Sequence, residues 1–287
     1  MGDNASESQA IYLPDQPFIV MHTQQYLKYS VKRHGILCFY AFVTGEGIDL
    51  AQAIPAGCID LIFCCDKEAP AAYVYGPILQ ARKPRHTLQK NTYFFGVQFM
   101  PGWLPAILQG RAHFADYIEQ ELPLEDLLPE SDLIHSITSV RSPCQQIRCF
   151  LDFYMPLYET QKASASVNQG NQIARIIRRE LLIDSTRGQI QTLADQLGVS
   201  VRYINRVFRQ EFGMPPKLFF SLIRFQQLLI QINRDEKKVS LDEIARYCGY
   251  YDRSHMSRDF LAFTNLTLRS YQQMIRSSNY GNLMIFR

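Results

Sequence analysis

The chain has 287 residues, of which 47% are apolar and 20% charged, and its formal net charge is +3. This composition excludes a wholly disordered protein, and the length suggests two domains. No apolar run approaches the roughly 18 residues of a membrane span, and residues 1–10 lack a signal-peptide pattern. We therefore expect a cytoplasmic protein that does not enter a membrane, with a disordered tail over residues 1–10.

The cysteines and histidines do not form a recognisable metal or disulfide pattern. The seven cysteines and six histidines include no C-x-x-C, H-x₃₋₅-H or H-E-x-x-H spacing. Free and mostly buried thiols are typical of a reducing compartment. We predict no metal site, no cofactor and no catalytic residues.

Residues 11–100 contain short apolar runs that are separated by Gly and Pro, such as GILCFYAFV, CIDLIFCC and TYFFGVQFMPG. Aromatic and β-branched residues at this spacing predict a mostly antiparallel sheet or a small barrel. An interior with aromatic rings, thiols and few charges would suit a small, largely apolar or aromatic ligand. The ligand-binding residues stay unknown at this point.

A basic segment could attract an acid or could be a solvated loop; its members are Arg82, Lys83, Arg85 and His86.

From about residue 103 the pattern becomes helical. Over residues 142–158, Ser142 can cap a helix that has Pro143 in its first turn. The apolar residues that recur on one face of this helix are Ile147, Phe150, Leu151, Tyr154 and Tyr158. This aromatic face could pair with a second copy in a homodimer, or it could pack on its own sheet.

The small polar residues 162–170 predict a linker. They divide the chain into an effector-binding or dimerisation domain, residues 11–161, and a helical domain, residues 171–277. Residues 278–287 follow as a tail.

Residues 193–219 and 244–271 repeat one another. Gly198 aligns with Gly249 at an offset of 51, and Arg206 aligns with Arg258 at an offset of 52, so the second copy has one extra residue in its turn. Each copy has a small alanine, then a glycine that can end a helix, then a Ser or Asp that can cap the next helix. This order predicts two helix-turn-helix units.

The second helix of each unit presents polar side chains outward. Arg can bond both acceptors of a guanine edge, and Asn can bond adenine in the same bidentate way. Residues 170–277 carry 17 Lys and Arg against 10 Asp and Glu, whereas residues 1–169 carry 12 against 17. A solvated polar face would explain one such helix equally well, but two matched copies on a basic region favour DNA binding.

Between the units, residues 215–232 carry a wide apolar stripe that predicts one long buried helix. Its members are Leu218, Leu222, Phe225, Leu229 and Ile232, with Phe219 and Ile223 beside them. Such a helix would fix the separation of the two units. We expect them to read adjacent turns on one face of a duplex.

Residues 171–277 resemble the DNA-binding domain of the AraC/XylS family of bacterial transcription regulators. The residues that carry the resemblance are LADQLGVSVRYINRVFRQEFGMPP, LIRFQQ and IARYCGYYDRSHMSRDF. The resemblance implies that the base-reading helices begin at Ser200 and Asp252. The positions that it implies for base contacts are Arg202, Asn205, Arg206, Arg253, Ser254, His255 and Arg258.

The chain departs from the family pattern at two places. Met256 stands where Phe is usual, which is a tolerable change in a core. Asn265 and Leu268 stand where the family often has the Gly and Pro of Gly-x-Thr-Pro. Asn still tolerates a left-handed turn, but losing Pro leaves the start of the last helix less rigid.

The runs IPAGCIDLIF, VYGP and FFGVQFMPG are similar to a sub-group of the family's N-terminal domains. The resemblance implies a two-domain α+β protein, with an N-terminal cupin-like β-barrel followed by appended helices. It implies an all-α C-terminal domain of two helix-turn-helix units joined by a long helix. In the family, the N-terminal domain binds an effector, dimerises, or does both.

The expected function is therefore that of a non-enzymatic, sequence-specific transcription regulator, an activator that acts on double-stranded DNA and RNA polymerase. A small molecule or partner would control it through the N-terminal domain. The alternatives are a purely dimerising N-terminal domain, a nucleoid-type protein without sequence preference, and a DNA-repair alkyltransferase with a zinc-bound cysteine cluster. For the last, the relevant residues lack the paired spacing that zinc needs: Cys38, Cys58, Cys64 and Cys65.

Overall fold

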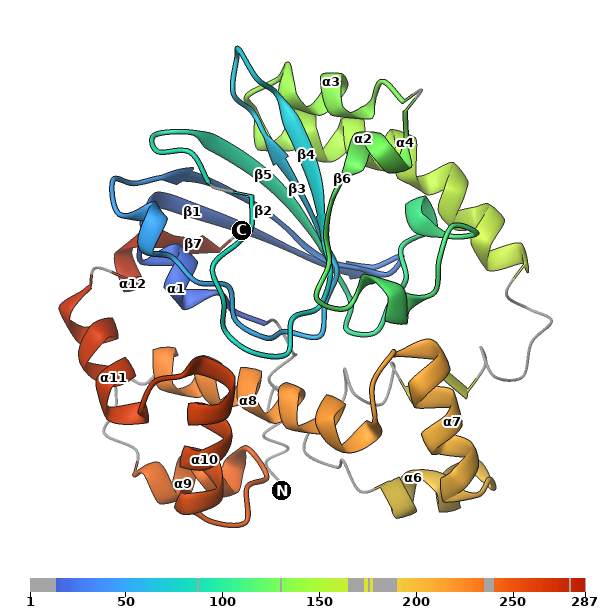
Figure 1. Cartoon of the computed structure of the whole chain (residues 1–287), viewed down its shortest axis with the longest axis vertical. Helices are drawn as coiled ribbons and strands as arrows, with labels where there is room; N and C mark the ends of the chain where they lie inside the picture. The colour runs from blue at the N-terminus through green and yellow to red at the C-terminus, as the bar shows by residue number, and fades with distance from the viewer. Residues whose placement is uncertain are drawn as a thin grey trace, which may run out of the picture.

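The computed structural model describes residues 14–86, 88–129, 131–164, 173–174, 176–177, 190–234, 240–278 and 280–286. It has two parts, an N-terminal sheet region and a C-terminal helical region, as predicted (Figure 1). The predicted tail over residues 1–10 and most of the predicted linker over residues 162–170 lie outside the described residues. Within those described, no helix is both long and apolar enough to cross a membrane.

Seven strands of the described chain form one sheet, in the order β6-β4-β3-β5-β2-β1-β7 (Figure 1). All neighbouring strands are antiparallel except β1 and β7, which are parallel. The strands are β1 (Thr23–Arg33), β2 (Ile36–Thr44), β3 (Asp60–Cys64), β4 (Ala71–Tyr75), β5 (Tyr93–Phe99), β6 (Glu121–Pro123) and β7 (Met284–Phe286). The expectation of a mostly antiparallel sheet is confirmed.

The sheet is open, so the predicted closure into a cupin-like barrel is not confirmed. Closure requires the two edge strands to pair with each other. In the part of the chain that the structure describes, β6 pairs only with β4, and β7 pairs only with β1. Both edge strands are three residues long and offer few backbone groups for further pairing. Residues of the N-terminal segment and of loops between strands line one face of the sheet instead, among them Pro14, Gln16, Ile54 and Pro77.

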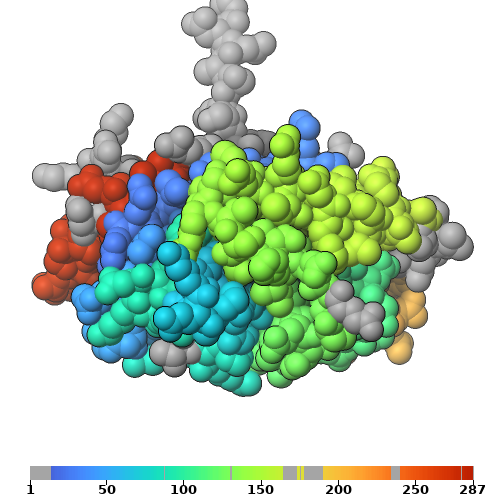
Figure 2. All heavy atoms as spheres, turned by 90° about the horizontal axis from the view of Figure 1, so that it is seen from above, coloured from blue at the N-terminus to red at the C-terminus, as the bar shows by residue number. Residues whose placement is uncertain are grey.

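Helices from the middle of the chain cover one face of the sheet. The rings of Phe39 in β2 and Phe150 are 5.7 Å apart between centroids, and Phe150 and Tyr154 are fully buried. The covering elements are η2 (Ala106–Leu108), η3 (Phe114–Tyr117), α2 (Leu124–Leu127), α3 (Leu133–Thr138) and α4 (Pro143–Ser164). Figure 2 shows the green and yellow-green atoms of this stretch over the middle of the molecule. The amphipathic helix predicted for residues 142–158 is confirmed as α4, and it packs on its own sheet.

The opposite face of the sheet is more polar and depends on a close approach at Gly96. The ring of Tyr40 lies across β5 there, and a Cβ atom on Gly96 would be 2.1 Å from Tyr40 Cζ. The tyrosine can therefore reach β3, where its hydroxyl donates to Asp60 Oδ1 at 3.0 Å. The helical segments that pack over this face are α1 (Pro17–Val20) and η1 (Ile48–Leu50).

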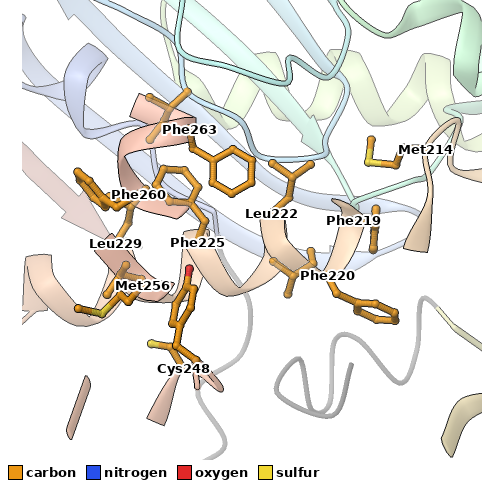
Figure 3. Close-up of a cluster of buried hydrophobic side chains, with 14 of the residues drawn as sticks. Met214, Phe219, Phe220, Leu222, Phe225, Leu229, Cys248, Met256, Phe260 and Phe263 are labelled. Atoms are coloured by element: carbon orange, nitrogen blue, oxygen red, sulfur yellow. The ribbon is translucent and has the colours of Figure 1, made fainter. Parts of the chain in front are cut away.

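The C-terminal region is helical, and α8 lies between its two halves. Its helices are α6 (Ile190–Leu197), α7 (Val201–Glu211), α8 (Pro216–Arg234), α9 (Leu241–Tyr247), α10 (Arg253–Thr264), α11 (Leu268–Ser277) and α12 (Tyr280–Leu283). Figure 3 shows Leu222, Phe225 and Leu229 of α8 among the side chains of the core, and all three are fully buried. The long helix predicted over residues 215–232 is thus confirmed.

The two regions share a hydrophobic core. Phe18 and Ile54 belong to the same buried cluster as the core of the helical region. Inside it, Gln226 of α8 donates to the carbonyl of Pro55 at 2.6 Å and accepts from the amide of Asp15 at 2.8 Å. Because the Gln226 side chain is fully buried, these hydrogen bonds fix α8 to the N-terminal region without competition from water.

The last residues join the sheet, which differs from the expected tail over 278–287. β7 pairs with β1, and Ile285 lies opposite Leu27. The hydroxyl of Tyr280, a residue 5% exposed, donates to the Asp15 carboxylate. A three-residue strand has little preference of its own, and it forms here because β1 offers an unpaired edge.

Removing residues 279–287 should lower the free energy of unfolding by about 2–3 kcal/mol. The buried side chain of Tyr280 is lost with its contacts, and β1 loses the strand that pairs with its edge. Urea unfolding of the full-length and shortened chains measures the difference. The control is Phe286→Ala, whose side chain is 56% exposed and whose loss should cost less than about 0.5 kcal/mol. Equal stability of the shortened and full-length chains would contradict the placement of β7 on β1.

Candidate nucleic-acid interface

The two predicted helix-turn-helix units have the same backbone connection. In the first, the amide of Val199 donates to the carbonyl of Ala194 at 3.0 Å, and in the second the amide of Tyr250 donates to the carbonyl of Ala245 at 2.9 Å. Both alanines are 1% exposed, which lets the following helix cross closely. The internal repeat is therefore present in hydrogen bonding and packing as well as in residue type.

The turns and caps also match the prediction. Gly198 and Gly249 have φ of +63° and +77°, the left-handed region that favours glycine. Ser200 and Asp252 then cap α7 and α10, because their side chains accept from the backbone N–H of each helix's third residue at 3.2 and 2.6 Å. Both second helices thus begin where the family resemblance implies.

The inward faces are apolar, as predicted. The residues buried on them are Ile204, Val207, Phe208 and Phe212 in the first unit and Met256, Phe260 and Phe263 in the second. Met256 is fully buried, so it fills the position of the usual Phe as a core side chain. Asn265 ends α10 with φ of +58°, and the Thr267 hydroxyl caps α11. These two residues supply the turn and the helix start that the family's Gly and Pro would otherwise fix.

On α7, the predicted contact residues differ in their exposure and in the contacts that they already make. Arg202 and Arg206 are exposed, and the guanidinium of Arg206 lies over the ring of Tyr203 at 4.7 Å from its centroid. Asn205 is half-buried, and its amide donates to the carbonyl of Val201 at 2.9 Å. Asn205 would have to break this intrahelical hydrogen bond before it could use both amide groups on an adenine edge.

On α10, Arg253, Ser254 and Arg258 are exposed. His255 is half-buried, and its Nε2 lies 3.8 Å from Asp259 Oδ2. The His255 ring also meets the ring of Tyr250 edge-on at 5.4 Å. His255 is therefore held against its own unit, and the other three side chains are more available to a ligand.

The structure gathers the seven predicted residues into two separate sets. α7 carries Arg202, Asn205 and Arg206, and α10 carries the other four, with α8 between the two helices (Figure 1). Within the described residues, none of the four arginines in these sets forms an ion pair. An unpaired, exposed guanidinium can bind phosphate or a base edge. No described contact shows which of these each arginine would bind, so their roles stay predictions.

Two features beside α10 were missed at the sequence level. Tyr251, in the turn before α10, is 90% exposed, and an exposed aromatic ring among arginines can pack on a sugar or a base. The GYYD run was the available signal, because a turn seldom needs two tyrosines. Asp259 Oδ2 lies 3.8 Å from His255 Nε2 and 3.9 Å from the guanidinium of Arg224 of α8. The contact with Arg224 is long-range and has no local signal.

Two thiols of the N-terminal region are buried, and one arginine of its basic segment is paired. Burial raises the pKa of the Cys38 thiol to about 12 and that of the Cys65 thiol to about 11. Arg82 donates to Glu119 at 2.7 Å and to Glu121 at 3.2 Å, so this guanidinium is already paired. Over the described ranges, no group of three or more His, Cys, Asp or Glu residues could hold a metal ion.

Comparison with known proteins gives two family matches. A model described as a helix-turn-helix domain matches residues 193–274, and one described as a domain of unknown function (DUF6597) matches residues 33–118. The chain is 26% identical over 124 residues to the HTH-type transcriptional activator RhaS of Escherichia coli O157:H7. That alignment covers 42% of this chain and 44% of RhaS, so the chain matches less than half the length of this curated relative.

Among solved structures, the chain is similar to ToxT from Vibrio cholerae. One ToxT structure has a TM-score of 0.39 at 12% identity, with 88% of this chain and 96% of ToxT covered. Another, bound to (E)-4-(8-methylnaphthalen-1-yl)but-3-enoic acid, has a TM-score of 0.41 at 10% identity, with 88% and 100% covered.

Proposed function

The chain belongs to the AraC/XylS family of transcription regulators, and on this premise we propose that it binds specific DNA sequences through α7 and α10. The observation that carries the proposal is the pair of matched helix-turn-helix units, each with exposed arginines that have no ionic partner among the described residues. One such surface would serve solubility equally well. Two of them at a fixed separation fit two successive major-groove segments of one duplex face.

Within each unit we assign base contacts to the middle of the helix. Arg206 and Arg258 lie one turn and a half into α7 and α10, occupy equivalent positions in the repeat, and can each bond a guanine edge in a bidentate way. Arg202 and Arg253 lie in the first turn of each helix. Their side chains can reach bases or phosphates near the N-terminus, where the helix dipole also favours a phosphate.

We further propose that a small molecule controls this DNA binding from the N-terminal region, and that the protein is an activator acting with RNA polymerase. A cavity on the concave face of the sheet supports the first part. The Pro14 and Gln16 residues that line it flank Asp15, whose amide donates to Gln226 of α8 at 2.8 Å. A ligand that shifts this segment would therefore act on the helix between the two units. The name of RhaS as an activator supports the second part.

Two alternatives make different predictions. A purely dimerising N-terminal domain would leave the cavity without a ligand, and a nucleoid-type protein would bind all sequences alike.

We propose no enzymatic role, since a methyl-accepting cysteine needs thiolate character and burial raises the pKa of the Cys38 and Cys65 thiols.

The test is to mix the protein with sheared genomic DNA from its own source and to sequence the retained fragments. We expect a small number of discrete sites upstream of genes, and increased transcript from those promoters when the protein is added to purified RNA polymerase. Even coverage of the genome at about 150 mM salt would show binding through phosphates alone and would contradict the proposal. Binding at discrete sites without increased transcript would reject only the activator role.

A further inference from the structure

The concave face of the sheet holds a cavity whose charged groups indicate what it could bind. The empty space there, including the part that opens to solvent, is about 840 Å³. The side chains that matter to its chemistry are Tyr26, Lys28, Tyr40, Phe42, Asp60 and Gln98. The sheet register places them on one face, since Lys28 lies opposite Tyr40 and Asp60 lies opposite Gln98.

Lys28 is a buried cation with few partners. The residue is 4% exposed, and its Nζ donates to the carbonyl of Pro14 at 2.7 Å. An ammonium has three N–H donors, and among the described residues no carboxylate lies within 4.0 Å of this one. Buried charges are normally paired, because desolvation is otherwise expensive. Two of the three N–H donors of Lys28 therefore have no acceptor among the described residues.

Asp60 is a half-buried anion with unused acceptor capacity. Its Oδ1 accepts from the Tyr40 hydroxyl at 3.0 Å, and its Oδ2 accepts from Gln98 Nε2 at 3.4 Å. A carboxylate has about four acceptor positions, so two remain. Burial raises the pKa of Asp60 to about 6, and the carboxyl is still mostly ionised at neutral pH.

The two charges lie on the same wall of the cavity without meeting. Lys28 is in β1 and Asp60 is in β3, and β5 and β2 lie between these strands. With about 4.8 Å per strand and an offset of two residues along the strands, the two backbones are roughly 16 Å apart. The ring of Tyr40 lies between them, across β5. The rings of Tyr26 and Phe42 lie on the other side of Lys28 from Asp60. Tyr26 stacks on Tyr40 and Phe42 with centroids 5.7 and 5.6 Å apart.

We propose that this cavity binds a small zwitterion of the amino-acid type. Its carboxylate would take the free donors of Lys28, its ammonium would donate to Asp60, and its side chain would lie on the rings of Tyr26 and Phe42. An acid without an amine would bring a second anion beside Asp60, and an amine without an acid would leave Lys28 unpaired. A ligand with both groups would pair Lys28 and Asp60, while the third charged residue of the lining, Glu121, is already paired with Arg82.

This inference deepens the proposed function, because it names the chemical class of the effector, but its test needs no DNA. Isothermal titration calorimetry on the full-length chain compares three probes with the same phenyl group: L-phenylalanine, 3-phenylpropanoate and 2-phenylethylamine. We expect L-phenylalanine to bind more tightly than either other probe by about tenfold or more, since each lacks one charged hydrogen-bonding group. Equal affinity of the three probes, tighter binding of either singly charged probe, or binding of none would overturn the proposal.

Two variants test which charged residue binds which group of the ligand. Lys28→Met should remove the advantage of L-phenylalanine over 2-phenylethylamine, and Asp60→Asn should remove its advantage over 3-phenylpropanoate. Lys90→Met, at an exposed lysine that lies 3.6 Å from Glu46, is the matched control and should bind like the unchanged chain. Circular dichroism shows whether each variant is folded. If a variant does not fold, the order of affinities of the three probes for the unchanged chain still tests the proposal. If the probes bind as expected but no discrete DNA sites are found, only the proposed function fails.

Discussion

Replacing Phe225 by alanine should lower the free energy of unfolding by about 3–5 kcal/mol. The residue is fully buried on α8. Its ring centroid lies 4.9 Å from that of Phe263 and 5.8 Å from that of Phe260, both on α10. Removing the ring leaves a cavity at the contact between the long helix and the second unit, where Figure 3 shows the three rings together. Because the core is continuous with Phe18 and Ile54 of the N-terminal region, we expect the whole chain to be destabilised.

Denaturant unfolding followed by circular dichroism measures this loss. Leu261→Ala on α10, where the side chain is 48% exposed, is a control on the same helix and should cost less than about 1 kcal/mol. A loss below about 1 kcal/mol for Phe225→Ala would mean that α8 does not hold the second unit through this contact.

Replacing Arg206 or Arg258 by alanine should weaken binding to the preferred DNA by about 1–3 kcal/mol each, which is about 5- to 150-fold. Each change should relax base preference at one segment only, because the two arginines lie on different helices on either side of α8. The losses should nearly add in the double variant, since distant and independent contacts are additive. A phosphate contact would instead weaken binding to all sequences equally and reduce the salt dependence.

Competition binding with single-base variants of the preferred site measures these effects. Arg148→Ala, at an exposed arginine on α4, is the matched control and should leave affinity and preference unchanged. If both arginine variants keep the full base preference of the unchanged chain, these residues do not read bases.

The helix-turn-helix units could be predicted from sequence because their determinants are local. Gly198 and Gly249 adopt positive φ, and Ser200 and Asp252 cap the following helices, as their types and spacing indicate. Hydrophobic periodicity predicted α8, because this signal is also local in the sequence. The hydrogen bond of Asn205 to Val201 was not foreseen, since an amide on a helix surface can turn either to a ligand or to its own backbone.

The sheet was less predictable because its partners lie far apart in the chain. Alternating and aromatic runs located most strands, but they did not show whether the edges close into a barrel. β7 depends on β1, more than 250 positions away, and nothing in the residues around Ile285 indicates that partner. Lys28 lies in a strand of mixed polar and apolar residues, and its burial follows only from the segment at Pro14 that covers it.

The most direct test of the central claim is selection of bound sequences from randomised duplex DNA by the full-length chain. We expect one type of site with two blocks of preferred bases, their centres about 34 Å or 10–11 base pairs apart. The spacing should be constant, because α8 is buried between the units and is hydrogen-bonded through Gln226 to the N-terminal region. A single short block, two blocks at variable spacing, or no enrichment at all would contradict the claim that two rigidly joined units read one face of the duplex.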